Sequence, residues 1–129
     1  MELLIKNTTA VSMDDANPVV ERCYIGVNQG KICWFSQQPP EEPADRTIDG
    51  AGKLALPGLV NAHTHLPMTL LRGYADDYAL QEWLNDHIFP AEAKLDARCV
   101  RAGAALGVAE CLRFGVTSVT DMYFQLPTI

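Results

Sequence analysis

The chain has 129 residues, 48% of them apolar and 20% charged, and it carries a net charge of −6. This length fits one small domain or a piece of a larger one, and the composition is that of a sequence that folds around a core. The acidic balance and the lack of a basic cluster argue against nucleic acid and anionic membranes as partners. The apolar start is far too short for a signal peptide, and no apolar segment approaches the roughly 20 residues of a membrane span, so we expect a cytoplasmic protein.

The first half of the chain has the pattern of short strands. Residues 19–29 alternate between apolar and polar, and residues 32–35 are rich in aromatic and branched side chains. Gly30 lies in the turn between them, where a positive φ is needed, so the two segments are predicted to form a β-hairpin. Further short extended pieces are expected at 3–6, 47–50 and 53–56, and a proline-rich loop at 37–45.

The second half has the pattern of a strand, a long loop, a helix and a second strand. Residues 59–62 form a short apolar run, as expected of a parallel strand that is buried on both faces. Helical turns are expected at 68–72 and 80–87 within the loop. Asp96 and Gly115 are the expected caps of one helix, and residues 116–122 form the second strand, which together predicts one βαβ unit.

The predicted helix combines an apolar face with a stripe of glycine. Gly103 and Gly107 lie one turn apart and would permit close packing against a sheet. The apolar face is made of Val100, Ala104, Val108, Cys111 and Leu112.

The four cysteines form no CxxC pair, and they lie in strand-like or helix-like stretches. Cysteine in such positions usually behaves as a small buried hydrophobe. We therefore expect reduced core residues, as is usual in the cytoplasm, at Cys23, Cys33, Cys99 and Cys111.

Two histidines, His63 and His65, follow the apolar run of the first predicted parallel strand. Side chains at i and i+2 of a strand point to the same face, about 6.6 Å apart along it. Two imidazoles in this arrangement can converge on one metal ion, with Zn–N bonds of about 2.0–2.1 Å. The end of a parallel strand is also where (β/α)8 barrels place their chemistry.

The sequence around the histidines resembles the amidohydrolase superfamily. The similar stretch begins with PGLVNAHTHLPMTLLRG at 57–73 and continues with ADD at 75–77, EWL at 82–84, IFPAE at 88–92 and TDMYF at 120–124. Within the superfamily, the pattern is most similar to the methylthioadenosine/S-adenosylhomocysteine deaminases and their chlorohydrolase relatives. The resemblance covers nearly the whole chain and implies a hydrolase that acts on cyclic amidines.

The resemblance implies a fold of the α/β class. Residues 57–129 would be the first strand–helix–strand portion of a metal-dependent (β/α)8 TIM barrel. Residues 1–56 would be part of the small β-sandwich that flanks such a barrel.

The resemblance also implies a site. His63 and His65 match the two metal ligands of the first barrel strand, and the cofactor would be one divalent metal, zinc or alternatively iron. Glu92 matches a residue that binds the ribose hydroxyls of an adenine nucleoside, and Trp83 lies in the loop that lines the substrate pocket. In the family, the metal activates a water molecule that replaces the amino group of the adenine ring.

Each of these residues also has a purely structural interpretation. Glu92 could be a solvated loop carboxylate, and Trp83 could be a core residue. Arg72 could be a surface charge, or it could bind a carboxylate such as Asp76 or Asp77. We expect a structural role for His87, and for Asp121 either a structural role or one that supports the metal ligands.

The chain departs from the family pattern in what it lacks. The resemblance requires further histidine ligands, an aspartate and a proton-shuttling glutamate from later barrel strands, so no catalytic residue is expected in this chain. A barrel takes roughly 250 residues. The chain is therefore expected to be an N-terminal fragment, inactive alone, that associates with itself or with a complementing C-terminal fragment.

Two further alternatives stay open at this point. One is a triazine- or guanine-type amidohydrolase, or a chlorohydrolase, with the same metal chemistry on another ring. The other is a truncated chain with no catalytic function.

Overall fold

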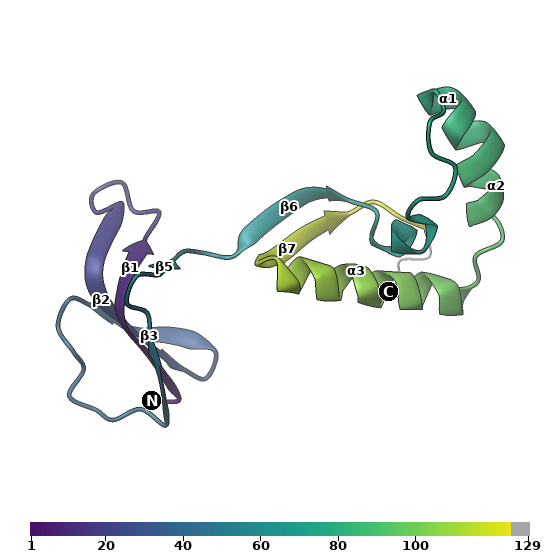
Figure 1. Cartoon of the computed structure of the whole chain (residues 1–129). Coiled ribbons are helices and arrows are strands. Elements are labelled where there is room, and N and C mark those ends of the chain that lie inside the picture. Colours follow the sequence, from purple (N-terminus) through teal and green to yellow (C-terminus); the bar gives the residue numbers. More distant parts are fainter. Residues whose placement is uncertain (125–129) are drawn as a thin grey trace. The chain divides into compact units, whose positions relative to one another are not determined.

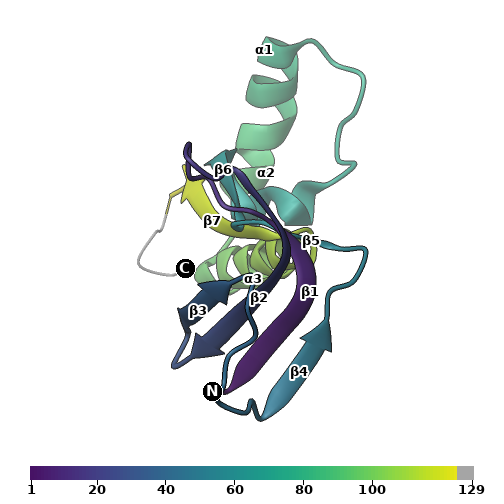
Figure 2. The same ribbon diagram turned by 90° about the vertical axis from the view of Figure 1, so that its left-hand side faces the viewer.

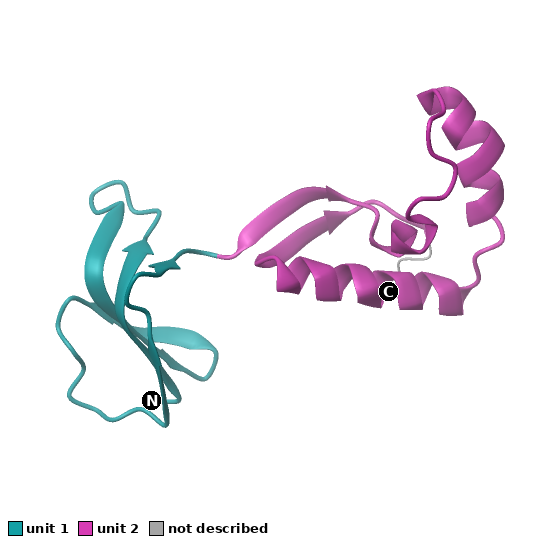
Figure 3. Ribbon diagram, viewed as in Figure 1, with its two compact units in different colours: residues 1–57 teal, residues 58–129 magenta. Residues whose placement is uncertain are grey.

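The computed structural model describes residues 1–124 of the chain. It divides into two compact units, residues Met1–Pro57 and Gly58–Ile129, which Figure 3 shows in different colours. Both units contain strands, and the helices belong to the second unit, so each is described by itself. No helix in the described part of the chain is long and apolar enough to cross a membrane.

The first unit is a five-stranded mixed sheet (Figure 2). The strand order is β3-β2-β1-β4, and β5 also pairs with β1. The β1/β2 and β2/β3 pairs are antiparallel, whereas β4 and β5 run parallel to β1. The strand bounds are β1 Leu3–Val11, β2 Val19–Asn28, β3 Lys31–Ser36, β4 Arg46–Asp49 and β5 Leu54–Ala55.

The predicted hairpin is confirmed. Asn28 and Lys31 pair across a two-residue turn, in which Gln29 has φ +49° and Gly30 has φ +70°. Two successive positive φ values are the signature of the tight turn that matches the twist of hairpin strands. β1 is longer than predicted, because it continues through polar residues past a register shift next to Asn7, which has φ +60°.

The core of the first unit is small. Ala10, Cys23 and Ile25 are buried, with Ile5, Val20 and Ala55 packed against them. The four cysteines are all free, as predicted, but they are not all core residues: Cys33 is exposed, and Cys99 and Cys111 are half-buried. Cys33 lies on β3, an edge strand that pairs only with β2 among the described residues.

The second unit contains the predicted strand, loop, helix and strand (Figure 1). β6 and β7 are parallel, and the long helix α3 connects back to β7. The first predicted helical turn lies in a 3₁₀ helix, η1. The second lies in three short helical segments, α1, η2 and α2, which follow one another without a break. The bounds are β6 Leu59–Thr64, η1 Leu66–Leu71, α1 Leu80–Glu82, η2 Trp83–Ile88, α2 Phe89–Glu92, α3 Ala97–Arg113 and β7 Val116–Asp121.

The prediction that the first parallel strand is buried on both faces is wrong for this chain. Every residue of β6 except Thr64 is exposed, and Val60 is 69% exposed. The reason is that the sheet consists of β6 and β7 within the described residues, so the apolar run has only one neighbouring strand.

Both predicted caps of α3 are confirmed. The Asp96 side chain accepts a hydrogen bond from the backbone N–H of Cys99 at 2.8 Å, and this contact lowers the carboxyl pKa. Gly115 has φ +79°, the left-handed conformation that favours glycine after a helix. Only part of the predicted apolar face is covered, since Val100 and Ala104 are buried but Leu112 is 63% exposed.

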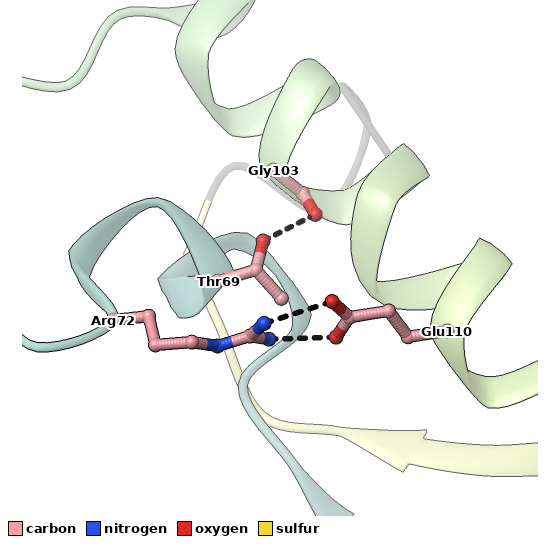
Figure 4. Close-up of polar contacts among 4 residues, drawn as sticks. All are labelled: Thr69, Arg72, Gly103 and Glu110. Carbon is pink, nitrogen blue, oxygen red and sulfur yellow. Dashed lines mark hydrogen bonds and ion pairs between the residues drawn. The ribbon is translucent and has the colours of Figure 1, made fainter. Parts of the chain in front are cut away.

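The glycine stripe of α3 packs against η1, not against a sheet as predicted. A Cβ atom on Gly103 would lie 2.4 Å from the carbonyl oxygen of Pro67, and one on Gly107 would lie 3.0 Å from the Leu66 side chain. The Thr69 hydroxyl also donates to the Gly103 carbonyl at 2.8 Å (Figure 4). The absent side chains let η1 lie directly on the helix backbone.

Arg72 binds a different carboxylate from the one predicted. Its guanidinium donates two hydrogen bonds to Glu110 of α3, at 2.9 and 2.6 Å, and not to Asp76 or Asp77 (Figure 4). The contact lowers the pKa of Glu110 and raises that of Arg72. This bidentate pair lies beyond the end of η1, so η1 is fixed to α3 along its whole length.

Candidate functional site

The two predicted metal ligands converge at the end of β6. The Nε2 atoms of His63 and His65 lie 3.1 Å apart. The ring centroids are separated by 5.0 Å, and the planes meet at 87°. The extended backbone through Thr64 places both rings on one side, while the Thr64 side chain points into the buried side of the strand.

A hydrogen bond from β7 fixes the orientation of His65. Its Nδ1 lies 2.6 Å from the carbonyl oxygen of Met122. A carbonyl only accepts, so Nδ1 carries the proton, and the tautomer with its single proton there has its lone pair on Nε2.

The geometry of the pair fits a shared metal ion. Two nitrogens bound tetrahedrally at about 2.0–2.1 Å from one zinc ion lie about 3.3 Å from each other. The observed 3.1 Å between the Nε2 atoms is close to this value. Among the described residues, no group of three or more His, Cys, Asp or Glu side chains could hold a metal ion, so the pair by itself does not make a closed metal site.

A cavity of about 290 Å³ opens beside His65. His65, Trp83 and Glu92 all line it, so the structure brings three of the four predicted site residues to one place. His63 faces a shallower hollow that it shares with His65. The rest of the lining is mostly apolar: Met68, Leu84, Ile88, Phe89, Met122, Tyr123 and Phe124.

Glu92 is a buried carboxylate at the end of α2. It is only 8% exposed, which is unusual for a glutamate and excludes the solvated-loop interpretation for the described structure. Trp83 is half-buried and contributes the aromatic wall of the same cavity. A carboxylate acceptor beside an aromatic and apolar wall suits a ligand that has both hydroxyl groups and a planar ring.

Tyr123 is a cavity residue that the sequence did not single out. Its hydroxyl is buried and has no hydrogen-bond partner among the described residues. Burial, and then the nearby Glu92 carboxylate, raise the pKa of this hydroxyl well above its usual value. Its position at the end of the second parallel strand was the available signal, because parallel strands end at the same edge of a sheet.

His87 lies apart from the histidine pair. It belongs to η2, and its ring packs on Tyr78 with centroids 4.1 Å apart. It lines none of the cavities beside His63 and His65. This packing agrees with a structural role.

Known proteins with a similar sequence are deaminases. The 5-methylthioadenosine/S-adenosylhomocysteine deaminase of Thermoanaerobacter pseudethanolicus is 46% identical over 129 residues, which is 100% of this chain and 30% of that protein. The chain spans only about 30% of the length of the curated relatives it matches.

Solved structures with the same fold contain zinc. An adenosine deaminase from Xanthomonas campestris with bound zinc superimposes with a TM-score of 0.88 at 38% identity, over 98% of this chain and 30% of that one. An atrazine chlorohydrolase from Arthrobacter aurescens, complexed with zinc, gives a TM-score of 0.81 at 27% identity, over 92% of this chain and 28% of that one.

The family is shown by a match over most of the chain. Residues 54–128 match the model of the amidohydrolase family, and this stretch includes the histidine pair, the cavity and both parallel strands. The chain therefore belongs to the amidohydrolase family.

Proposed function

We propose that these residues form part of a metal-dependent hydrolytic deaminase that acts on adenine nucleosides of the methylthioadenosine or S-adenosylhomocysteine type. The observation that carries the proposal is the convergence of His63 and His65, whose Nε2 atoms lie 3.1 Å apart, beside a cavity that His65 lines together with Glu92. The family match and the names of the similar proteins support it.

In this proposal the two units have different tasks. Residues 57–129 are the first strand–helix–strand portion of a (β/α)8 barrel, with the histidines at the C-terminal end of its first strand. Residues 1–56 are part of a β-sandwich that flanks the barrel. The mixed sheet of the first unit and the parallel β6–β7 pair of the second support this division.

His63 and His65 would hold one divalent metal, zinc or alternatively iron, through their Nε2 atoms. Such a metal lowers the pKa of a bound water towards about 7 and so supplies a nucleophile at neutral pH. The residues of this chain orient the ligands: the Met122 carbonyl accepts a hydrogen bond from Nδ1–H of His65, so the Nε2 lone pair is directed to the metal. The zinc in similar solved structures supports the choice of metal.

Glu92 and Trp83 would bind the nucleoside. A buried carboxylate can accept hydrogen bonds from two vicinal ribose hydroxyls, and Trp83 offers an aromatic face to the base or the sugar. The apolar remainder of the cavity suits the thioether substituent of methylthioadenosine.

A triazine-type hydrolase is the second candidate. The similarity to a zinc-containing atrazine chlorohydrolase favours it, because the same metal chemistry operates there on another ring. A free heterocycle has no vicinal diol, however, so it cannot make the paired hydroxyl contacts proposed for the buried Glu92 carboxylate. This difference favours the nucleoside.

We expect the chain to be inactive by itself. Two histidines are fewer than the three protein ligands that catalytic zinc sites usually have. Metal affinity is also coupled to the formation of the complete fold. The purified chain should therefore deaminate neither methylthioadenosine nor S-adenosylhomocysteine.

The test is to complete the chain. Residues 1–129 are fused to the part of the Thermoanaerobacter deaminase that they do not cover, and the loss of adenine absorbance of methylthioadenosine is followed with zinc present. We expect turnover by the fusion, loss of turnover in His63→Ala and His65→Ala, and none by residues 1–129 alone. Turnover by the isolated, monodisperse chain, or full activity of both histidine variants, would contradict the proposal.

A further inference from the structure

His65 is the single residue between the end of β6 and the start of η1. It is the N-cap residue of η1, with φ −135° and ψ 68°, but its side chain makes no capping hydrogen bond. A residue in this position ordinarily uses its side chain to satisfy the first free N–H groups of the helix. The imidazole of His65 instead faces His63 and Met122.

The missing cap comes from Asp121 at the end of β7. Its Oδ1 accepts a hydrogen bond from the backbone N–H of Leu66 at 2.8 Å, the first N–H of η1. The same oxygen lies 2.7 Å from the hydroxyl of Thr64. One carboxylate oxygen therefore holds both residues that flank His65.

The backbone of Met122 completes the attachment. Its N–H donates to the carbonyl oxygen of Thr64 at 3.0 Å, and its own carbonyl accepts from Nδ1 of His65 at 2.6 Å. Thr64 is thus bound to both residues 121 and 122, His65 to residue 122 and Leu66 to residue 121, all of them more than fifty positions away in the sequence. Within this set, Asp121 is the side chain that contacts both neighbours of the ligand, through the hydroxyl of Thr64 and the backbone N–H of Leu66.

We propose that Asp121 is a positioning residue for the metal ligand His65. By capping η1 from a neighbouring strand, it releases the side chain of the N-cap residue for the metal, and it holds the residues on both sides of that ligand through the Thr64 hydroxyl and the Leu66 N–H. The inference rests on the proposed function only in taking His65 as a ligand. Asp121 caps η1 from a different strand, because the N-cap residue His65 makes no capping hydrogen bond of its own.

The chemistry of the carboxylate supports this assignment. Oδ2 of Asp121 is buried and has no hydrogen-bond partner among the described residues, so Oδ1 alone makes the two contacts. An asparagine could keep an acceptor oxygen in the Oδ1 position, whereas an alanine could not. The pair of variants therefore separates loss of the acceptor from loss of the charge.

The test measures metal binding in the fusion protein described above. Zinc affinity is determined by competition with a chromophoric chelator, and the absorption spectrum of the Co²⁺ form reports the ligand geometry. We expect Asp121→Ala to weaken zinc binding about 10- to 100-fold and to alter the Co²⁺ spectrum. Asp121→Asn should retain most of the affinity and the wild-type spectrum.

Asp96→Ala is the matched control. Asp96 also accepts a hydrogen bond from a backbone N–H at 2.8 Å and also caps a helix, but at the start of α3. It should lower the midpoint of thermal unfolding without changing zinc affinity. Equal zinc affinity in the Asp121→Ala and wild-type proteins would overturn the inference, as would equal losses in Asp121→Ala and Asp96→Ala.

If Asp121→Ala does not fold, Thr64→Val decides. It keeps the shape of the side chain but removes the hydroxyl, which lies 2.7 Å from Asp121 Oδ1 and 3.0 Å from the Thr120 carbonyl oxygen. Zinc should then bind more weakly than to wild type, and wild-type affinity would overturn the inference. The proposed function fails separately: a fusion that binds zinc through the histidines but deaminates no nucleoside leaves the role of Asp121 intact.

Discussion

At the scale of single residues, the site contains contacts between neighbours in the sequence and contacts between residues more than fifty positions apart. The pairing of His63 with His65 follows from strand geometry, because residues i and i+2 share a face. The orientation of His65 depends on Met122, 57 positions away, and no local pattern contains that information. Tyr123 was missed for the same reason: it reaches the cavity only because β6 and β7 end side by side.

Glu92 provides the test of the substrate class. In the fusion protein, Glu92→Gln should raise KM for methylthioadenosine about 10- to 100-fold, because a hydrogen bond to a charged acceptor is replaced by a neutral one. The value of kcat should change much less, since the ribose is remote from the reacting carbon.

The control for this substitution is Glu82→Gln, an exposed carboxylate of α1 that does not line the cavity. It should leave KM unchanged when initial rates are compared over the same substrate range. An unchanged KM in Glu92→Gln would remove the ribose assignment and favour a free heterocycle as the substrate.

At the scale of elements, local signals predicted the ends of α3 and the hairpin turn correctly. Asp96, Gly115 and Gly30 act through their own backbone neighbourhood, which the sequence contains in full. The packing partners could not be predicted in this way. The glycine stripe lies on η1, and Arg72 binds a glutamate 38 positions away, because the path of the chain between the two parallel strands decides both contacts.

The contact between η1 and α3 makes a graded prediction for the two glycines. Gly103→Ala should destabilise the second unit by about 1–3 kcal/mol, because its Cβ would lie 2.4 Å from a backbone oxygen that cannot move aside cheaply. Gly107→Ala should cost less, because its Cβ would lie 3.0 Å from a leucine methyl and 3.1 Å from the Leu66 carbonyl oxygen, which need to shift by only a few tenths of an ångström, and alanine favours the helix by up to about 1 kcal/mol. Chemical denaturation of both variants in the fusion measures the difference, and an equal loss of stability would contradict the close packing.

At the scale of the whole chain, the apolar residues of the sequence predict a larger core than the described residues form. The apolar run of β6 predicted burial on both faces, yet Leu59 is 52% and Val60 69% exposed. The core clusters that do form are small, with Ile88 and Val100 the largest fully buried side chains of the second unit. The apolar run shows that β6 is suited to burial between neighbouring elements. Whether β6 is buried depends on how many strands and helices are present to cover it.

The exposed apolar strand predicts how the chain behaves alone. A two-stranded sheet has unpaired edges and an uncovered apolar face, and such surfaces associate with other chains. Purified residues 1–129 should therefore show an average mass that rises with concentration in sedimentation velocity. Val60→Lys should shift the distribution towards the monomer, because a charge on the exposed strand opposes pairing of its face. Leu80→Lys, an equally exposed apolar residue on α1, should not do so, and a monodisperse monomer before any substitution would contradict the prediction.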